Sequence, residues 1–147
     1  ARGKNFLRTI LRLAAEREQL RVVGDQFGAP TWSRSIAEAT VTAMLNWQPN
    51  KSGTYHMTCA GRTSWHGFAQ AILRQYQTMQ TARNWPPLKA SPDGIEAITT
   101  EQYPTPARRP ANSVLDNTRL REAFEMEMPN WQDGLSEALQ EAVTLKV

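Results

Sequence analysis

The sequence has one cysteine, two histidines and no long apolar run. A single cysteine, Cys59, cannot form a disulfide within the chain and argues against a cysteine-rich metal site. Low cysteine content fits a reducing compartment, so we expect a cytoplasmic protein. No apolar run approaches the roughly 20 residues that a membrane-spanning helix needs, so we expect no membrane segment.

The usual catalytic motifs are also missing. The sequence has no Gly-rich dinucleotide fingerprint, no phosphate-binding loop and no Gly-x-Ser-x-Gly elbow. We expect His56 in a strand and His66 solvated in the first turn of a helix, and neither has a second metal ligand at a useful spacing. We interpret Cys59 as a small buried residue, not a reactive thiol. The residues therefore predict no catalytic group.

Charge is unevenly distributed along the chain. The net charge is +3. Residues 1–34 hold seven basic against three acidic side chains, whereas residues 116–147 hold three against seven. A basic first segment suits nucleic acid or an anionic small ligand. Because no dense Lys/Arg block, helix-turn-helix or RNA-binding motif is present, we expect no nucleic-acid partner, and a nucleic-acid-binding domain is the weakest hypothesis.

The apolar spacing predicts a mixed structure. Helical spacing predicts helices over 5–18, from a cap at Thr31 or Ser33 to near Trp47, from Ser64 past Tyr76, after Asp116, and after Pro129. Short β-branched runs predict strands at 20–23, 54–59 and 95–99, and three prolines hold 103–113 extended. We therefore predict an α/β fold: a small mixed lobe of about five helices and three or four short strands in one domain, 1–147.

Three runs are more specific than composition. They are Gly3-Lys4-Asn5-Phe6, then Val-Gly-Asp-Gln-Phe-Gly-Ala-Pro-Thr at 23–31, and Tyr-Pro-Thr-Pro-Ala-Arg-Arg-Pro-Ala-Asn-Ser at 103–113. Two weaker runs occupy 63–69 and 129–135. In order and spacing, these runs resemble the dTDP-4-dehydrorhamnose reductases, members of the extended short-chain dehydrogenase/reductase family. The resemblance covers essentially the whole chain.

The resemblance implies the C-terminal, substrate-binding part of such a reductase. The family reduces the C4 ketone of dTDP-4-dehydro-L-rhamnose with NADPH or NADH in dTDP-L-rhamnose biosynthesis. Its Gly-rich motif and catalytic Tyr-x-x-x-Lys lie upstream of everything present here, and none of the three tyrosines has a lysine four residues on. We expect the full-length protein to be the enzyme, with an N-terminal Rossmann domain as the missing partner. This chain alone should be inactive and bind neither NADPH nor NADH.

The resemblance also implies substrate-binding residues: Asn5, Val23, Gln26, Thr31, Arg109 and Asn112. Arg109 matches an arginine on the nucleotide diphosphate, a role that suits its planar guanidinium. Asn112 matches a polar residue that reaches the ribose, and Asn5 matches one that lies along the diphosphate at a helix start. Val23 ends the strand that flanks the base, and Gln26 and Thr31 add hydrogen bonds. The plainer alternatives are a surface Arg109, a capping Asn5 and a Gln26 that only satisfies loop backbone.

The resemblance leaves alternatives open for the oligomeric state and for the function of the chain. Some family members form a dimer around a metal held partly by a glutamate, whose counterpart here is Arg34, so we expect no metal. An apolar face normally covered by the missing domain should be exposed and could drive homo-oligomer formation. The main alternative function is a non-catalytic nucleotide-sugar-binding or regulatory subunit of the same fold. The sequence upstream of Ala1 would distinguish it from the enzyme.

Overall fold

Helices and short strands alternate along residues 5–141, the part of the chain that the computed structural model describes. In that part, five α-helices and four strands occur in the order α1 (Phe6–Glu16), β1 (Leu20–Val23), β2 (Phe27–Gly28), α2 (Ser33–Leu45), β3 (Thr63–Ser64), α3 (Trp65–Arg83), β4 (Ile95–Ile98), α4 (Thr118–Phe124) and α5 (Trp131–Glu141). Three short 3-10 turns, η1 (Pro49–Lys51), η2 (Pro92–Gly94) and η3 (Thr100–Gln102), complete them. The predicted mixed α/β lobe is confirmed.

The strands form two small pairs. β1 and β4 are parallel, in a register that sets Leu20 opposite Ile95 and Val23 opposite Ile98. β2 and β3 are antiparallel, with Phe27 opposite Ser64. Because parallel strands run in the same direction, β1 and β4 end at the same edge of their pair. The loops after Val23 and Ile98 therefore begin side by side.

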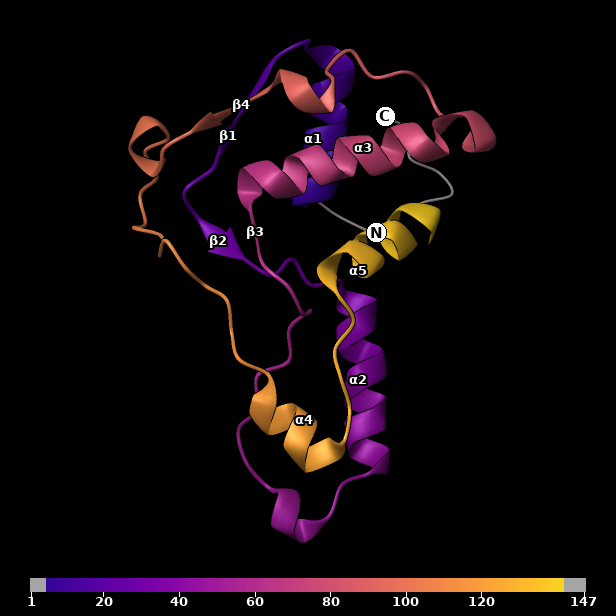
Figure 1. Cartoon of the computed structure of the whole chain (residues 1–147), viewed down its shortest axis with the longest axis vertical. Coiled ribbons are helices and arrows are strands. Elements are labelled where there is room, and N and C mark those ends of the chain that lie inside the picture. Colours follow the sequence, from indigo (N-terminus) through magenta and orange to yellow (C-terminus); the bar gives the residue numbers. More distant parts are fainter. Residues whose placement is uncertain (1–4, 142–147) are drawn as a thin grey trace.

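Helix α3 is the centre of the main core. Its buried face carries Phe68, Ala69, Ile72, Leu73 and Tyr76. These side chains belong to one buried cluster with residues of α1, α5, β1 and β4. Figure 1 shows α1 and α5 beside α3, with the β1–β4 pair along the same part of the molecule. Each fully buried leucine or isoleucine in this cluster stabilises the fold by about 1.5–3 kcal/mol relative to an exposed one.

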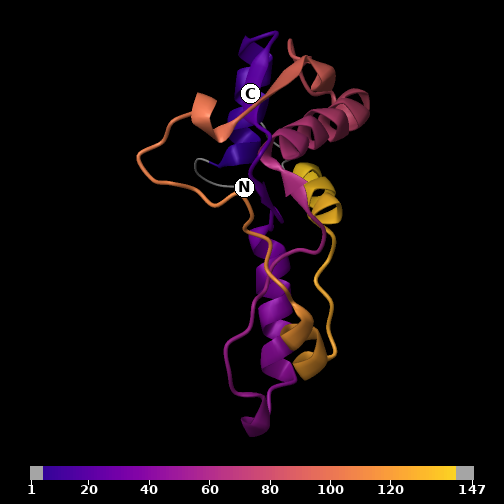
Figure 2. The same ribbon diagram turned by 60° about the vertical axis from the view of Figure 1, so that its left-hand side comes forward.

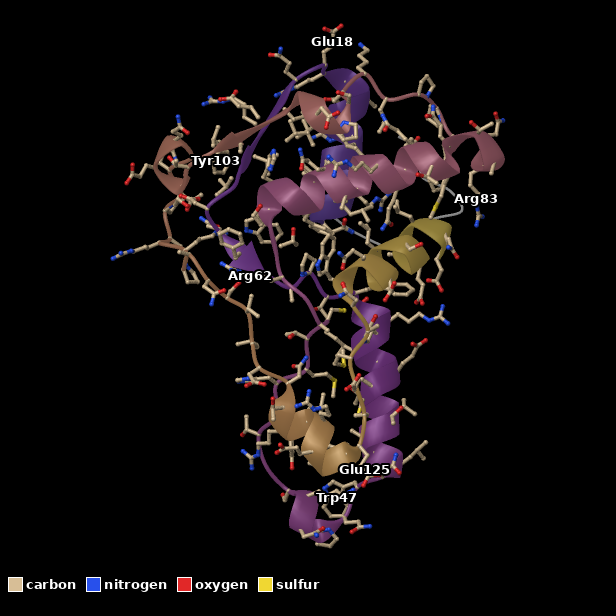
Figure 3. All side chains as sticks on the ribbon, in the orientation of Figure 1. Glu18, Trp47, Arg62, Arg83, Tyr103 and Glu125 are labelled. Atoms are coloured by element: carbon tan, nitrogen blue, oxygen red, sulfur yellow. The ribbon has the colours of Figure 1, made fainter. Side chains whose placement is uncertain are left out.

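A second, smaller cluster lies between α2 and α4. It contains Ala39, Leu120, Phe124 and Met128. In Figures 1 and 2, α2 and α4 lie side by side and project away from α1, α3 and α5. Figure 3 shows Trp47 and Glu125, which follow these two helices, at the same extremity.

Helix α2 bears a run of exposed apolar side chains. Met44 and Leu45 are 72% and 81% exposed, and Ile36 and Val41 are also exposed. The sequence predicted an exposed apolar face, and that a missing domain normally covers this face stays a prediction. Within residues 5–141, no helix combines the length and the apolar character needed to cross a bilayer.

Two helix starts have side-chain caps that the sequence suggested, at Asn5 and Ser64, whereas α4 is preceded by Asn117 without a side-chain cap and not by a capping Asp116. Asn5 Oδ1 accepts a hydrogen bond from Arg8 N at 2.9 Å, and Ser64 Oγ accepts one from Gly67 N at 3.0 Å. The predicted cap at Thr31 or Ser33 is wrong, because α2 starts after Trp32 without a side-chain cap. Thr31 Oγ1 instead donates to Ala29 O and accepts from Cys59 N.

The predicted strand at 54–59 is also wrong. Although burial alternates over residues 54–57, the backbone of Thr58 and Cys59 bonds to side chains and not to a neighbouring strand. Asn117 Nδ2 donates to Thr58 O at 2.6 Å, and Thr58 N donates to Asn117 Oδ1 at 3.3 Å. Cys59 N donates to Thr31 Oγ1. Cys59 itself is 2% exposed, so its predicted burial is confirmed.

Candidate functional site

Strand β2 belongs to one of the specific sequence runs, 23–31, and lies next to another, 103–113, and next to the weaker run at 63–69. On one side it pairs with β3. On the other side, Phe27 N donates to Ala111 O at 2.8 Å, and Ser113 N donates to Phe27 O at 2.9 Å. Figure 1 shows the connection from η3 to α4 passing beside β2. Parts of three segments therefore meet at one place, namely residues 26–30, 63–65 and 109–113. Phe27 and Ser113 are 86 residues apart in the sequence.

A cavity of about 240 Å³ opens where these segments meet. Its walls come from the β2 loop, the start of α3 and the proline-rich segment: Gln26, Phe27, Gly28, Ala29, Pro30, Thr63, Ser64, Trp65, Arg109, Pro110 and Ser113. Two of the six predicted site residues, Gln26 and Arg109, line it. The volume lies below the roughly 300–1,000 Å³ of most small-molecule sites. The cavity thus has room for one part of a larger ligand.

Arg109, the Arg62 guanidinium on the Phe27 ring and the start of α3 contribute positive charge at this cavity. Arg109 is exposed on its wall and, within the described residues, forms no ion pair. The Arg62 guanidinium lies 4.0 Å from the centre of the Phe27 ring, and Figure 3 shows Arg62 close to β2. The N-terminus of α3 also lies at the cavity, since Trp65 is its first residue. A helix N-terminus and two guanidinium groups together attract an anion.

An aromatic wall links the cavity to α1. Trp65 is 39% exposed, and its ring centre lies 4.8 Å from that of Phe6. Phe6 in turn stacks on Phe68 at 5.5 Å. An exposed tryptophan supported from behind by packed aromatic rings is suited to contact with a flat ring or a sugar face.

Gln26 is the most buried polar residue of the cavity wall, with 8% exposure. Its Nε2 donates to Thr100 Oγ1 at 3.0 Å, and its backbone carbonyl accepts from Trp65 N. The Thr100 hydroxyl donates to Asp25 Oδ1 at 2.7 Å. Hydrogen bonds from the Thr100 backbone N–H and hydroxyl lower the pKa of Asp25.

The other four predicted residues lie around the cavity and not in its wall. Asn112 is exposed beside β2, between Ala111 and Ser113, and forms an isolated bridge with Phe27. Asn5 caps α1 next to Phe6. Val23 ends β1 half-buried, and the hydroxyl of Thr31 is engaged with Ala29 and Cys59. Their ligand contacts remain predictions.

The histidines and Arg34 have structural partners. His66 is half-buried, which makes its predicted solvation wrong: Nε2–H donates to Ile95 O at 2.9 Å. His56 is exposed, and its Nδ1–H donates to Asp116 O. Arg34 forms ion pairs with Glu38, at 2.7 Å, and with Glu141. Over residues 5–141, no three His, Cys, Asp or Glu side chains are grouped as metal ligands.

Sequence reasoning missed several residues of the site. Trp65 and Thr63 belong to a run that the sequence marked only as weakly distinctive, and an aromatic residue directly after a capping serine was the available signal. Ser113 ends the distinctive run at 103–113 but was not singled out, and Arg62 had no local signal. Their positions depend on the pairing of β2 with two distant segments.

The described residues thus form a mixed α/β lobe with a small cavity beside a strand pair, a concave place where a small ligand could bind. A family model for the RmlD substrate binding domain matches residues 1–144, and the chain belongs to this family. The chain is 54% identical over 138 residues to the dTDP-4-dehydrorhamnose reductase of Burkholderia thailandensis and 38% identical over 146 residues to that of Escherichia coli K12. The crystal structure of dTDP-4-dehydrorhamnose reductase from Bacillus anthracis in complex with NADP has a similar fold, with 30% identity and a TM-score of 0.77.

These relatives are longer than the chain. The matches cover 90%, 97% and 96% of this chain but 45%, 46% and 44% of the three reductases, in the same order. The chain thus spans about half the length of the curated relatives that it matches, and corresponds to their C-terminal part. The resemblance that the sequence motifs indicated is confirmed.

Proposed function

We propose that the chain is the sugar-nucleotide-binding part of a longer dTDP-4-dehydrorhamnose reductase. The full-length protein would reduce the C4 ketone of dTDP-4-dehydro-L-rhamnose with NADPH or NADH. The observation that carries the proposal is the cavity at β2, where Arg109 and the start of α3 lie together. This part would hold the substrate so that its ketone meets the hydride, and orientation of this kind lowers a barrier by several kcal/mol.

The cavity chemistry favours the diphosphate as the part of the ligand held there. A guanidinium can form two parallel hydrogen bonds to phosphate oxygens. The helix N-terminus and the Arg62 guanidinium add positive charge at close range. Trp65 in the cavity wall and Asn112 beside it are both exposed and would contact the neighbouring base, ribose or sugar.

The residues present do not fit a dinucleotide. The sequence has no Gly-rich turn between a strand and a helix start, and the 240 Å³ cavity is too small for two joined nucleotides. The hydride donor and the catalytic tyrosine and lysine would come from the rest of the full-length protein. The exposed apolar side chains of α2 offer a contact surface for that part or for a second copy.

Loss of the Arg109 charge tests the proposal in the full-length protein. Arg109→Ala should weaken dTDP-L-rhamnose binding about tenfold or more, because a hydrogen bond to a charged group contributes about 1.5–3 kcal/mol. Arg108→Ala removes the same charge one residue away, outside the cavity wall, and is the matched control. Isothermal titration calorimetry gives both dissociation constants, and steady-state reduction gives KM.

The outcomes separate the hypotheses. A larger effect for Arg109→Ala than for Arg108→Ala supports a diphosphate site at the cavity, and equal effects contradict it. A natural full-length protein that binds the nucleotide sugar but lacks the Gly-rich motif and Tyr-x-x-x-Lys would be the non-catalytic subunit. An upstream sequence with both motifs, together with measurable reduction, would establish the enzyme.

A further inference from the structure

We propose that Asp25 and Thr100 fix the amide of Gln26 in one orientation, so that Gln26 Oε1 faces the cavity as a hydrogen-bond acceptor for the ligand. This inference rests on the proposed function, because it assigns a specific task to one wall of the same cavity. Asp25 and Thr100 are then positioning residues, which act on the ligand only through Gln26.

The direction of these hydrogen bonds follows from which groups can donate. An ionised carboxylate only accepts, and the Asp25 carboxylate takes hydrogen bonds from Thr100 N at 3.0 Å and from Thr100 Oγ1 at 2.7 Å. A hydroxyl has one proton, and that proton is given to Asp25. Thr100 Oγ1 can therefore only accept from Gln26, at 3.0 Å, so Gln26 must present its NH₂ group. The amide oxygen then points the other way.

The lowered pKa of Asp25 keeps this direction fixed. Its carboxyl is held below the ordinary value of 3.8, chiefly by the Thr100 backbone N–H and then by the hydroxyl. Asp25 is therefore ionised at neutral pH and cannot donate. A protonated Asp25 would release the hydroxyl proton and allow the amide to turn over.

The fold places this chain of bonds at the edge of the cavity. Asp25 and Gln26 follow β1, and Thr100 follows β4, its parallel neighbour. Gly24 N donates to Ile98 O at 2.8 Å, which extends the pairing past the strand ends. The Asp25–Thr100 bonds thus join two loops that leave the same edge, and they hold Gln26 between that edge and the cavity.

Gln26 Oε1 is available to a ligand. Gln26 lines the cavity, and within residues 5–141 its side-chain oxygen takes part in no hydrogen bond. In the same part of the chain, the one fully buried side-chain oxygen or nitrogen without a partner is Gln75 Oε1. Gln26 Oε1 therefore keeps some contact with solvent, although the residue as a whole is 8% exposed. A largely buried acceptor in a cavity is best satisfied by a ligand donor.

The ligand must therefore carry a donor near its anionic group. We assign this donor either to the imide N–H of the thymine base or to a hydroxyl of the diphosphate-linked sugar. A ligand that lacks the donor would leave Gln26 Oε1 unpaired and should bind about tenfold more weakly.

The test uses the full-length protein and two ligand comparisons. Calorimetry compares dTDP with its N3-methyl analogue, which lacks the imide N–H, and dTDP-L-rhamnose with dTDP, which lacks the sugar hydroxyls. In the unmodified protein, at least one comparison should favour the donor-bearing ligand about tenfold. Gln26→Leu should bring the ratio of the two dissociation constants in that comparison close to one, and Thr100→Val should do the same. Thr100→Ser, which keeps the hydroxyl, should restore it.

A double substitution separates positioning from general structural damage. In a Gln26→Leu background, Thr100→Val should change the ligand ratio no further. Thr78→Val, on the exposed side of α3, is the matched control and should leave the ratio unchanged. The side-chain NH₂ signals of Gln26 in a ¹H–¹⁵N spectrum should shift with Thr100→Val and not with Thr78→Val.

Two failures are distinguishable. If dTDP and dTDP-L-rhamnose bind the unmodified protein but the ratio survives Thr100→Val, the positioning role is wrong and the proposed function stands. A ratio near one in both comparisons for the unmodified protein overturns the acceptor role of Gln26. Absence of binding by both ligands overturns the proposed function together with the inference.

Discussion

A methyl group added at Gly28 should displace the Ser113 hydroxyl and loosen the segment that carries Arg109. A Cβ at this position would lie 2.9 Å from Ser113 Oγ, closer than two such atoms can approach. Ser113 Oγ now donates to Phe27 O at 3.0 Å, and Ser113 N donates to the same oxygen. In Gly28→Ala the serine hydroxyl must rotate away and give up its bond. The backbone bond remains but must adjust.

The expected magnitude follows from that one lost bond. A hydrogen bond of this kind contributes about 0.5–1.5 kcal/mol, and the exposed position keeps the loss near the lower end. Gly28→Ala should therefore lower the melting temperature by about 1–4 °C, given the usual 2–4 °C per kcal/mol for a protein of this size. Because Arg109 lies four residues before Ser113, dTDP-L-rhamnose binding by the full-length protein should weaken several-fold.

The second-site variant Ser113→Ala tests whether contact between the new methyl group and Ser113 Oγ causes the losses of stability and binding. It removes the hydroxyl that the new methyl group meets and leaves the backbone bond intact. The double variant Gly28→Ala/Ser113→Ala should be no less stable than Gly28→Ala alone and should recover part of its binding. Calorimetric unfolding and ligand titration measure the two effects. If the stability losses of the two single variants simply add in the double variant, contact with Ser113 Oγ is not the cause of the Gly28→Ala loss, and the reasoning is refuted.

Two further predictions concern the residues directly before α4. Asn117→Ala leaves Thr58 N and O without their partners, so we expect a loss of about 1–3 kcal/mol in the free energy of unfolding, measured by urea denaturation, with Asn46→Ala as the control. The pKa of Asp116 is lowered by the Thr118 side chain and backbone, with smaller effects from Arg121 and His56. A carboxyl whose pKa is lower in the folded state than in the unfolded state stabilises the fold at pH values above the unfolded-state pKa. This stabilisation is lost as the pH falls through the folded-state pKa. The stability difference between the unmodified protein and Asp116→Asn should thus be present at pH 7 and shrink below about pH 4. A difference that is constant from pH 7 to pH 3 would contradict this assignment.

Local signals in the sequence were enough to predict the helices that build the core. For α3, the capping Ser64 and the helical spacing from Phe68 to Tyr76 are both local properties, and the structure has both. The strand at 95–99 was predicted in the same way and appears as Ile95–Ile98. Where each backbone group bonds within its own segment, or the apolar pattern alone selects the buried face, sequence reasoning succeeds.

The sequence alone did not predict contacts between residues that are far apart in the chain. Residues 54–59 have the alternation of a strand, but Asn117, 59 residues away from Thr58, takes the place of a neighbouring strand. His66 was expected in water because a helix start is usually exposed, yet the Ile95 carbonyl reaches it across 29 residues. No local pattern distinguishes an amide side chain that caps an extended segment from one that faces solvent.

The site combines both cases, and its size limits what this chain can hold alone. The motifs marked the segments at 23–31 and 103–113, but only the pairing of Phe27 with Ala111 and Ser113 brings Arg109 to Gln26. The resulting cavity of about 240 Å³ is smaller than a site for a whole nucleotide sugar. Trp65 in its wall and Asn112 beside it are exposed. We therefore expect the diphosphate to be held here and the rest of the ligand to lie against a second surface. Tight binding of the nucleotide sugar and its reduction would then both require that second surface. We therefore expect both only in the full-length protein.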